Sequence, residues 1–259
     1  MNFIRRLFGV RDKGEELHDS QHAIPDQMRL YAIGDIHGRL DLLEKLLHEI
    51  EQDSTDYHGE VTVVFLGDYV DRGPQSKQVL DYLVQLKRQE EFKTVFLLGN
   101  HEQTMLDFMA DVRASEHWLR YGGIETLNSY DVQISSEDLH DESLERIRSE
   151  LRRNLPAAHM EFLRGLRQSY ELGDYYFAHA GVRPDIPLSA QVLDDLLWVR
   201  EPFLSSNADF GRIVVHGHSI SEEPVVRSNR IGIDTGAFAS GRLTALVLEG
   251  NTRKFLITG

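Results

Sequence analysis

Three short apolar runs in the first hundred residues share one pattern. Each ends at a glycine that is followed at once by a polar residue able to bind a metal, in residues 31–35, 63–68 and 95–100. Runs of this kind, rich in β-branched and aromatic residues and bounded by glycine, are typical of buried strands. Between them, residues 40–47 and 79–86 have helical spacing. Strands that alternate with helices predict right-handed crossovers and a mainly parallel sheet.

The second half of the chain carries four further apolar runs, at residues 175–178, 213–215, 231–233 and 243–248. Because the later runs lack long helices between them, we expect hairpins of a mixed or antiparallel sheet. Residues 102–170 have a polar, helical pattern, and we interpret their acidic stretch, 135–150, as a solvated helix face. No low-complexity linker divides the chain, which predicts one domain over residues 28–259 behind a flexible tail at 1–27.

The composition of the chain limits the partners and the kinds of reactive site that it can have. The 259 residues are 41% hydrophobic, which is ordinary for a globular protein, and 42 acidic against 28 basic residues give a formal charge of −14. So acidic a surface disfavours nucleic acid as a partner. The absence of cysteine excludes disulfides, thiolate metal sites and cysteine nucleophiles. No apolar run approaches the roughly 20 residues of a membrane span, and no signal peptide is evident, so we expect a cytoplasmic protein without stable membrane insertion.

Candidate metal ligands follow each predicted strand. Five such clusters occur, at residues 35–37, 68–72, 100–102, 179 and 216–218. Since the carboxyl ends of parallel strands meet at one edge of a sheet, these side chains are expected to converge. Oxygen and imidazole donors without thiolate suit Mn²⁺, Fe or Zn²⁺, and two such ions can share a hydroxide nucleophile. The other seven histidines follow no strand end and are interpreted as ordinary surface or core residues: His18, His22, His48, His58, His117, His140 and His159.

Taken in order, these motifs resemble those of the phosphoprotein phosphatase branch of the metallophosphoesterases, and most of all the small bacterial and phage enzymes typified by lambda phosphatase. The segments that carry the resemblance are Gly34-Asp-Ile-His-Gly38, Gly67-Asp-Tyr-Val-Asp-Arg-Gly73, Gly99-Asn-His-Glu102, His179-Ala-Gly181 and Gly217-His-Ser219, with supporting matches at residues 117–123, 198–201 and 233–237. The resemblance spans about Leu30 to Leu248. It implies an α/β fold in which two mixed β-sheets pack as a sandwich flanked by helices, with the site at one edge.

The resemblance also implies a role for each residue. Two divalent ions are expected, most often Mn²⁺, with Fe or Zn as alternatives. The implied metal ligands are Asp35 and His37 for the first ion, Asp68 as the bridge, and Asn100, His179 and His218 for the second. The implied proton donor is His101, held by Asp71, and the implied phosphate ligands are Arg72, Arg200 and Asn100. His216 is interpreted as a packed neighbour of the site.

The expected activity is that of a metal-dependent phosphomonoesterase, in which a metal-bridging hydroxide attacks phosphate in line. Its implied substrates are serine or threonine phosphoproteins, with dual specificity left open, or small phosphoesters. One alternative is a symmetrical diadenosine tetraphosphate hydrolase, but such relatives typically lack Asp71 and have Asp in place of Glu102, which favours the phosphatase. The other alternative, an inactive regulatory or binding domain, predicts a missing ligand or proton donor, and every implied position is filled.

Overall fold

The computed structural model describes residues 17–18, 21–89, 92–114, 118–134 and 141–259, and within them it contains two mixed β-sheets. The six-stranded sheet has the order β1-β11-β10-β2-β3-β4, formed by Leu17–His18, Thr252–Ile257, Thr244–Glu249, Met28–Ile33, Glu60–Phe65 and Lys93–Phe96. The five-stranded sheet has the order β5-β6-β7-β9-β8, formed by Ser169–Leu172, Tyr175–Ala178, Ile213–His216, Arg230–Gly232 and Val225–Val226.

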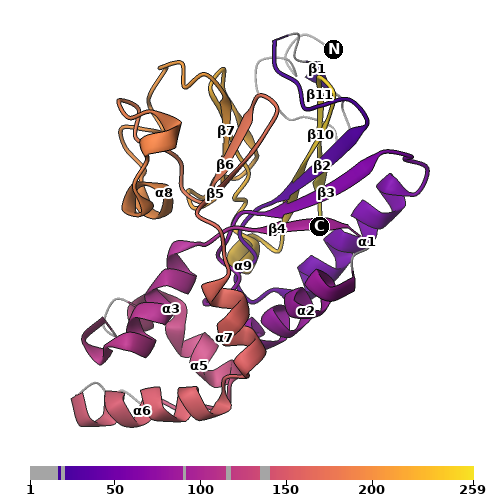
Figure 1. The fold of residues 1–259 in the computed structure, drawn as a ribbon. Coiled ribbons are helices and arrows are strands. Elements are labelled where there is room, and N and C mark those ends of the chain that lie inside the picture. The colour runs from indigo at the N-terminus through magenta and orange to yellow at the C-terminus, as the bar shows by residue number, and fades with distance from the viewer. Residues whose placement is uncertain (1–16, 19–20, 90–91, 115–117, 135–140) are drawn as a thin grey trace, which may run out of the picture.

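Helices cover the outer faces of this sandwich and extend it at one end (Figure 1). Helices α1 (Leu40–Ser54) and α2 (Ser76–Gln89) lie along the six-stranded sheet, and α8 (Leu193–Trp198) lies beside the five-stranded one. A helical lobe follows β4. It comprises α3 (Asn100–Ala110), α5 (Ile124–Ser129), α6 (Asp141–Asn154) and α7 (Ala157–Arg164). The short α9 (Ala237–Ser240) lies near the junction of the sheets and this lobe.

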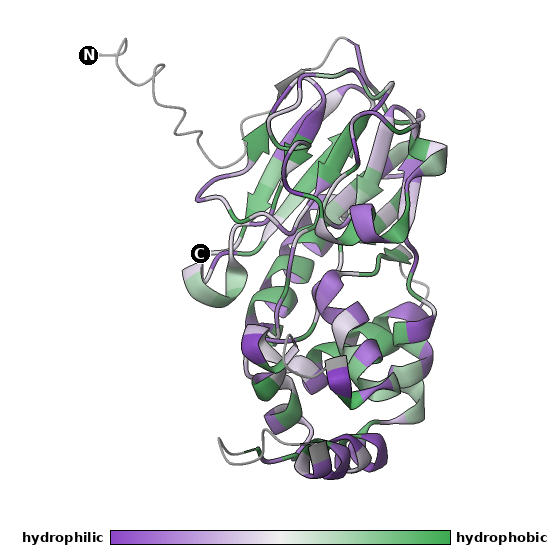
Figure 2. Cartoon of the chain, turned by 90° about the vertical axis from the view of Figure 1, so that its left-hand side faces the viewer, coloured by the Kyte–Doolittle hydropathy of each residue, from purple (hydrophilic) through white to green (hydrophobic). Residues whose placement is uncertain are grey.

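The alternation of side chains along β2 divides the core into layers. Leu30 and Ala32 point into the apolar cluster between the two sheets, together with residues of β6 and β7 such as Phe177. Tyr31 and Ile33 point the other way, into the cluster that includes α1 and α2. Because successive strand residues face opposite sides of a sheet, a strand buried on both faces is apolar throughout. Figure 2 shows this as hydrophobic strands inside more polar surroundings.

The structure confirms the predicted α/β sandwich and its first parallel unit, but it corrects the second half. β2, β3 and β4 are parallel, as expected. The expected hairpins are wrong for β6, β7 and β9, which also pair in parallel. Residues 179–212 connect β6 to β7 and are long enough for the crossover that parallel pairing needs. A hairpin does join β10 to β11.

The folded domain begins earlier than residue 28. Within the predicted tail, Leu17–His18 pairs with β11 and Ile24 is only 3% exposed in the core between the sheets. The backbone of Ala23 and Ile24 bonds to Asp174 and Gly250, so this stretch is fixed by the hydrogen-bonding groups of two turns. Residues 1–16 lie outside the described residues, so the tail prediction stands untested there.

The acidic stretch is an amphipathic helix where the structure describes it. In α6, Leu144, Ile147 and Leu151 are buried in the main core cluster, and the charged side chains alternate with them. Figure 2 shows the polar side of α6 facing outward, which agrees with a solvated helix face. Residues 135–140 of this stretch lie outside the described residues. No helix in the described part of the chain is both long and apolar enough to cross a membrane.

Candidate active site

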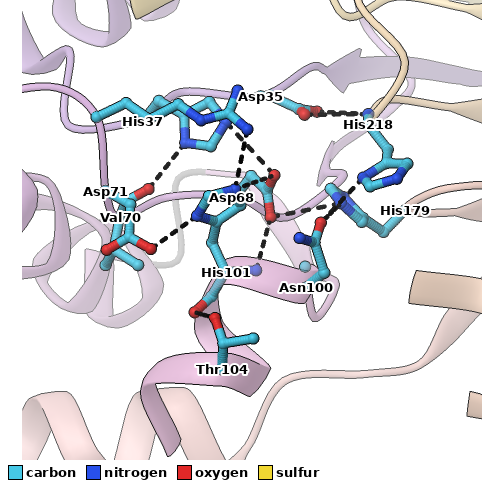
Figure 3. A network of polar contacts seen from close by, with 12 residues as sticks. Asp35, His37, Asp68, Val70, Asp71, Asn100, His101, Thr104, His179 and His218 are labelled. Carbon is cyan, nitrogen blue, oxygen red and sulfur yellow. Dashed lines mark hydrogen bonds and ion pairs between the residues drawn. The ribbon is translucent and has the colours of Figure 1, made fainter. Parts of the chain in front are cut away.

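The strand-end side chains converge as the sequence predicts. Asp35, His37, Asp68, Asn100, His179 and His218 are all buried, and they follow β2, β3, β4, β6 and β7 (Figure 3). Glycines permit this approach: a Cβ atom at Gly99 would overlap Asp68 Oδ1, and a Cβ at Gly217 would overlap Asp35 Oδ1. The parallel β6 and β7 bring the two later clusters to the same edge as the three earlier ones.

Asp68 lies at the centre of the cluster, between two histidines. Its Oδ2 atom is 3.4 Å from Nε2 of His37, and its Oδ1 atom is 3.4 Å from Nε2 of His179. Each carboxylate oxygen thus faces a different imidazole. Two groups of candidate metal ligands share this carboxylate, His37–Asp68–His101 and Asp68–His179–His218, with the ligand atoms of each group within 4.8 Å of one another. This is the geometry that a bridging carboxylate requires.

The backbone fixes which imidazole nitrogen faces the cluster. Nδ1 of His37 donates to the carbonyl of Val70 at 2.9 Å, and Nδ1 of His179 donates to the carbonyl of Leu66 at 2.9 Å. Each Nε2 therefore carries a lone pair, as metal-binding histidines with a backbone partner do. For His179, the Nε2 lone pair faces Oδ1 of Asn100 at 2.8 Å. Two hydrogen-bond acceptors therefore face each other with no proton between them. Such convergence of electron pairs is stabilised by a cation, and the residues present fit one.

Burial keeps these imidazoles neutral. It lowers the pKa of His37 and of His218 to about 3, and it also lowers the pKa of His179. Asp68 behaves in the opposite way: burial alone would raise its pKa, but the surrounding histidines outweigh that effect and hold the pKa well below the ordinary value. Neutral imidazole and ionised carboxylate are the states that coordinate divalent metals.

Asp35 is buried beside two other carboxylates of the site, Asp68 and Asp234. Its role as a ligand of the first ion stays a prediction: the group of close ligand atoms around His37 and Asp68 contains His101 and not Asp35. Asp35 accepts the backbone N–H of His218 at 3.0 Å. Burial, with the charges of Asp234 and Asp68, raises the pKa of Asp35, and burial raises that of Asp234 to about 6. Asp234 was given no role from the sequence, although it follows the apolar run 231–233.

His101 and Asp71 form the pair that was expected. Nδ1 of His101 lies 2.7 Å from Oδ2 of Asp71. Burial lowers the pKa of His101, but the charge of Asp68 and the hydrogen bond that His101 donates to Asp71 outweigh it, so the net pKa is raised. Trp118 Nε1 and Thr126 Oγ1 also donate to Asp71, at 3.0 and 2.6 Å. These donors keep the Asp71 carboxylate in one orientation. The sequence around Thr126 gave no indication that Thr126 contacts Asp71.

The loops that carry the site are held in an unusual backbone conformation. Of the seven non-glycine residues with positive φ in the described chain, five are site residues: His37, Asp68, Asp71, Arg72 and His218. Such strain persists where surrounding contacts enforce it. For the loop after β3, Glu102 supplies such contacts, since its buried carboxylate accepts the N–H groups of Asp68, Tyr69 and Val70 at 2.8, 2.7 and 3.1 Å. Its role is therefore to anchor the loop.

The two arginines among the predicted phosphate ligands line one small cavity of about 250 Å³. Arg72 places Nη2 3.2 Å from Nε2 of His101, and Arg200 places Nε 3.3 Å from Nε2 of His218. Asn100, Thr104, Tyr121 and Trp198 also line this cavity. The two guanidinium groups thus concentrate positive charge at this cavity in a protein whose net charge is negative.

His216 and His159 agree with their interpretation as packed residues outside the metal cluster. His216 is buried, receives a hydrogen bond from Arg230 at 3.2 Å, and packs edge-on against Phe203 rather than facing Asp68. His159 is buried between Tyr130 and Asp81, with partners at 2.7 and 2.9 Å. His117 and His140 lie outside the described residues.

Comparison with known proteins places this arrangement in a family. Residues 28–240 match the calcineurin-like phosphoesterases. A bis(5'-nucleosyl)-tetraphosphatase PrpE [asymmetrical] of Anoxybacillus flavithermus is 29% identical over 83% of this chain and 88% of its own. Serine/threonine-protein phosphatase 2 of Escherichia coli is 27% identical over 83% of this chain and 90% of its own.

Among solved structures, that of a putative diadenosine tetraphosphatase superposes with a TM-score of 0.59 over 94% of this chain and 96% of its own, at 21% identity. These matches confirm the metallophosphoesterase fold, while a specific likeness to lambda phosphatase is not among them. The chain belongs to the calcineurin-like phosphoesterase family.

Proposed function

We propose that this protein is a metal-dependent phosphoesterase that transfers a phosphoryl group to water. One observation carries the proposal: the two oxygens of Asp68 face the Nε2 atoms of His37 and His179, each at 3.4 Å, beside a cavity lined by Arg72 and Arg200. Two cations held around one carboxylate, next to two guanidinium groups, suit a phosphate that gains negative charge in the transition state.

Two divalent ions would be held by the candidate ligands Asp35, His37, Asp68, Asn100, His179 and His218. When bound, such ions neutralise phosphate oxygens and make water a stronger nucleophile. Manganese is the first candidate, and iron or zinc fits the same donors.

The protein's own groups then have separate tasks. Arg72 and Arg200 bind the phosphate oxygens, because a planar guanidinium offers paired donors. His101 gives a proton to the leaving oxygen from Nε2, the nitrogen that Asp71 leaves free. Asp71 holds the ring and stabilises its charged form, while Trp118 and Thr126 hold Asp71.

For the substrate, a dinucleoside tetraphosphate is our first candidate. The relative from Anoxybacillus flavithermus and the superposed structure both carry names of this kind. Glu102, which favoured a phosphoprotein substrate in the sequence, is fully buried against backbone N–H groups and lines no part of the phosphate cavity. A serine/threonine phosphoprotein is the second candidate, supported by the similarity to the E. coli phosphatase.

A substrate panel with Mn²⁺ tests the proposal. It compares diadenosine tetraphosphate, an aryl phosphate, and peptides that contain phosphoserine, phosphothreonine or phosphotyrosine. Preferred hydrolysis of the tetraphosphate supports the first candidate, and its products reveal the cleaved bond: two ADP for symmetrical cleavage, ATP and AMP for asymmetrical cleavage. Preferred hydrolysis of phosphoserine or phosphothreonine peptides supports the second. Turnover of no phosphate compound by metal-loaded protein contradicts both.

A further inference from the structure

A second, larger cavity of about 610 Å³ adjoins the phosphate cavity. Arg72 and Tyr121 line both cavities, so they form the boundary between them. Beyond this boundary the wall includes Arg120, Ile124 and Phe238. None of these three residues belongs to the candidate metal ligands or to the proton donor and its partners.

Large hydrophobic side chains are exposed in the wall of this cavity. Tyr121 is 47% exposed and Ile124 is 38% exposed, and they are two of the four large hydrophobic side chains that the described chain exposes. Phe238 lies beneath Arg72, whose guanidinium carbon is 4.8 Å from the ring centroid. Apolar side chains gathered next to a polar pocket are typical of a ligand-binding surface.

The position of His101 indicates which part of a substrate would lie there. Its Nε2 atom is 3.2 Å from Arg72, so the proposed proton donor lies beside the boundary residue. A leaving group that takes its proton from Nε2 would therefore lie next to Arg72. A backbone hydrogen bond links Arg72 to the cavity wall: Arg72 donates its N–H to the carbonyl of Gly122 at 3.2 Å.

The chemistry of the wall matches a nucleotide. Aromatic and aliphatic side chains offer flat contacts to a base, and base–aromatic stacking is sequence-tolerant and strong. Arg120 and Arg72 offer positive charge to further phosphates, and Glu125 on the same wall can accept a hydrogen bond from an exocyclic amine. We propose that this second cavity is the leaving-group subsite and that it binds a nucleotide, its base against Tyr121 and Ile124. The inference rests on the proposed phosphoesterase activity.

Two variants of the wall test this assignment, Tyr121→Ala and Ile124→Asp, with Val192→Ser as the control. Val192 is 58% exposed and lines neither cavity. For each wall variant, KM for diadenosine tetraphosphate should rise about five- to a hundredfold relative to KM for a phosphoserine peptide, the range expected for lost stacking. Val192→Ser should leave the ratio of the two KM values at the wild-type level. Equal changes for both substrates would overturn the assignment, as would an equal rise in KM for a phosphotyrosine peptide.

A binding measurement separates this inference from the proposed activity. Calorimetric titration of the protein with ADP and with inorganic pyrophosphate compares a ligand that has a base with one that has none. Wild-type protein should bind ADP more tightly, and both wall variants should lose that advantage. Equal affinities in the wild type would overturn the subsite even if the enzyme is active. A protein that binds ADP preferentially but hydrolyses no phosphate compound would instead contradict the phosphoesterase proposal.

Discussion

Nδ1 of His101 lies 2.7 Å from Oδ2 of Asp71, and this carboxylate also accepts hydrogen bonds from Trp118 and Thr126. The imidazole is therefore held in one orientation, with Nε2 directed to the phosphate cavity. A ring held in this way can act as a proton donor without having to reorganise when the leaving group departs.

His101→Asn should have an effect that depends on the leaving group. With a poor leaving group such as a serine alkoxide, we expect a loss of about 10²–10⁴-fold in kcat, because the leaving oxygen needs a proton. The loss should be smaller with an activated aryl phosphate. Asp71→Asn should reproduce the defect in milder form, since it removes the charge that supports the imidazolium. The measurement is the ratio of variant to wild-type rates on the two substrates.

The metal content of the His101→Asn variant must be measured as well, because His101 lies in one group of candidate ligands with His37 and Asp68. A proton donor leaves the metal content near two ions per chain after substitution. Loss of one ion from His101→Asn would identify His101 as a ligand, and equal losses on both substrates with full metal content would leave it a positional role.

Chelation of divalent metals should abolish activity, and Mn²⁺ should restore it. Asp68→Asn should deplete the bound metal more than any other single substitution, since both ligand groups contain this carboxylate. Elemental analysis of purified protein, with and without chelator, gives the metal content alongside the rate. Full activity in metal-free protein would refute the proposed dependence on metal.

Arg72→Ala and Arg200→Ala should each weaken phosphate binding and leave the metals in place. Each change removes a charge-assisted donor worth roughly 1.5–3 kcal/mol, which corresponds to about a ten- to a hundredfold loss in kcat/KM. Arg212→Ala is a suitable control, because Arg212 pairs with Glu171 at 3.1 Å and does not line the cavity. Wild-type kinetics in either test variant would mean that the phosphate binds elsewhere.

Glu102→Ala should destabilise the protein as well as inactivate it. Three backbone N–H groups of residues 68–70 would lose their acceptor inside the core, at about 1–3 kcal/mol for each buried donor. The positive-φ conformation of Asp68 would lose its main restraint. Thermal melting should show a lower Tm even in metal-free protein. An unchanged Tm with lost activity would indicate a direct chemical role for Glu102 instead.

His159 should make stability depend on pH. Burial lowers its pKa, so the unfolded chain binds a proton more readily than the folded one. Its contribution is therefore fully present above the ordinary histidine pKa and is lost as the pH falls below it. His159→Asn, which cannot be protonated, should cost about 1–3 kcal/mol near pH 8 through its lost hydrogen bonds, and the gap to wild type should narrow near pH 5. Melting curves at both pH values measure the gap, with the exposed His48→Asn as control.

The sequence by itself determined the framework and most of the site residues. Short apolar runs that end in glycine predicted β2, β3 and β4, because strand burial and tight turns leave a local pattern. The polar residue after each glycine marked the cluster around Asp68, because parallel strands present their carboxyl ends at one edge. Local chemistry was enough for this step, and the motif order identified the family.

Only the tertiary structure decided how distant segments meet. The parallel pairing of β6 with β7, the donation from Thr126 to Asp71, and the packing of Phe238 beneath Arg72 all join segments that are far apart in the chain. It also gave Glu102 its role as a loop anchor. Local sequence preferences cannot encode these contacts, because each depends on side chains that become neighbours only when the two sheets and the helical lobe pack together.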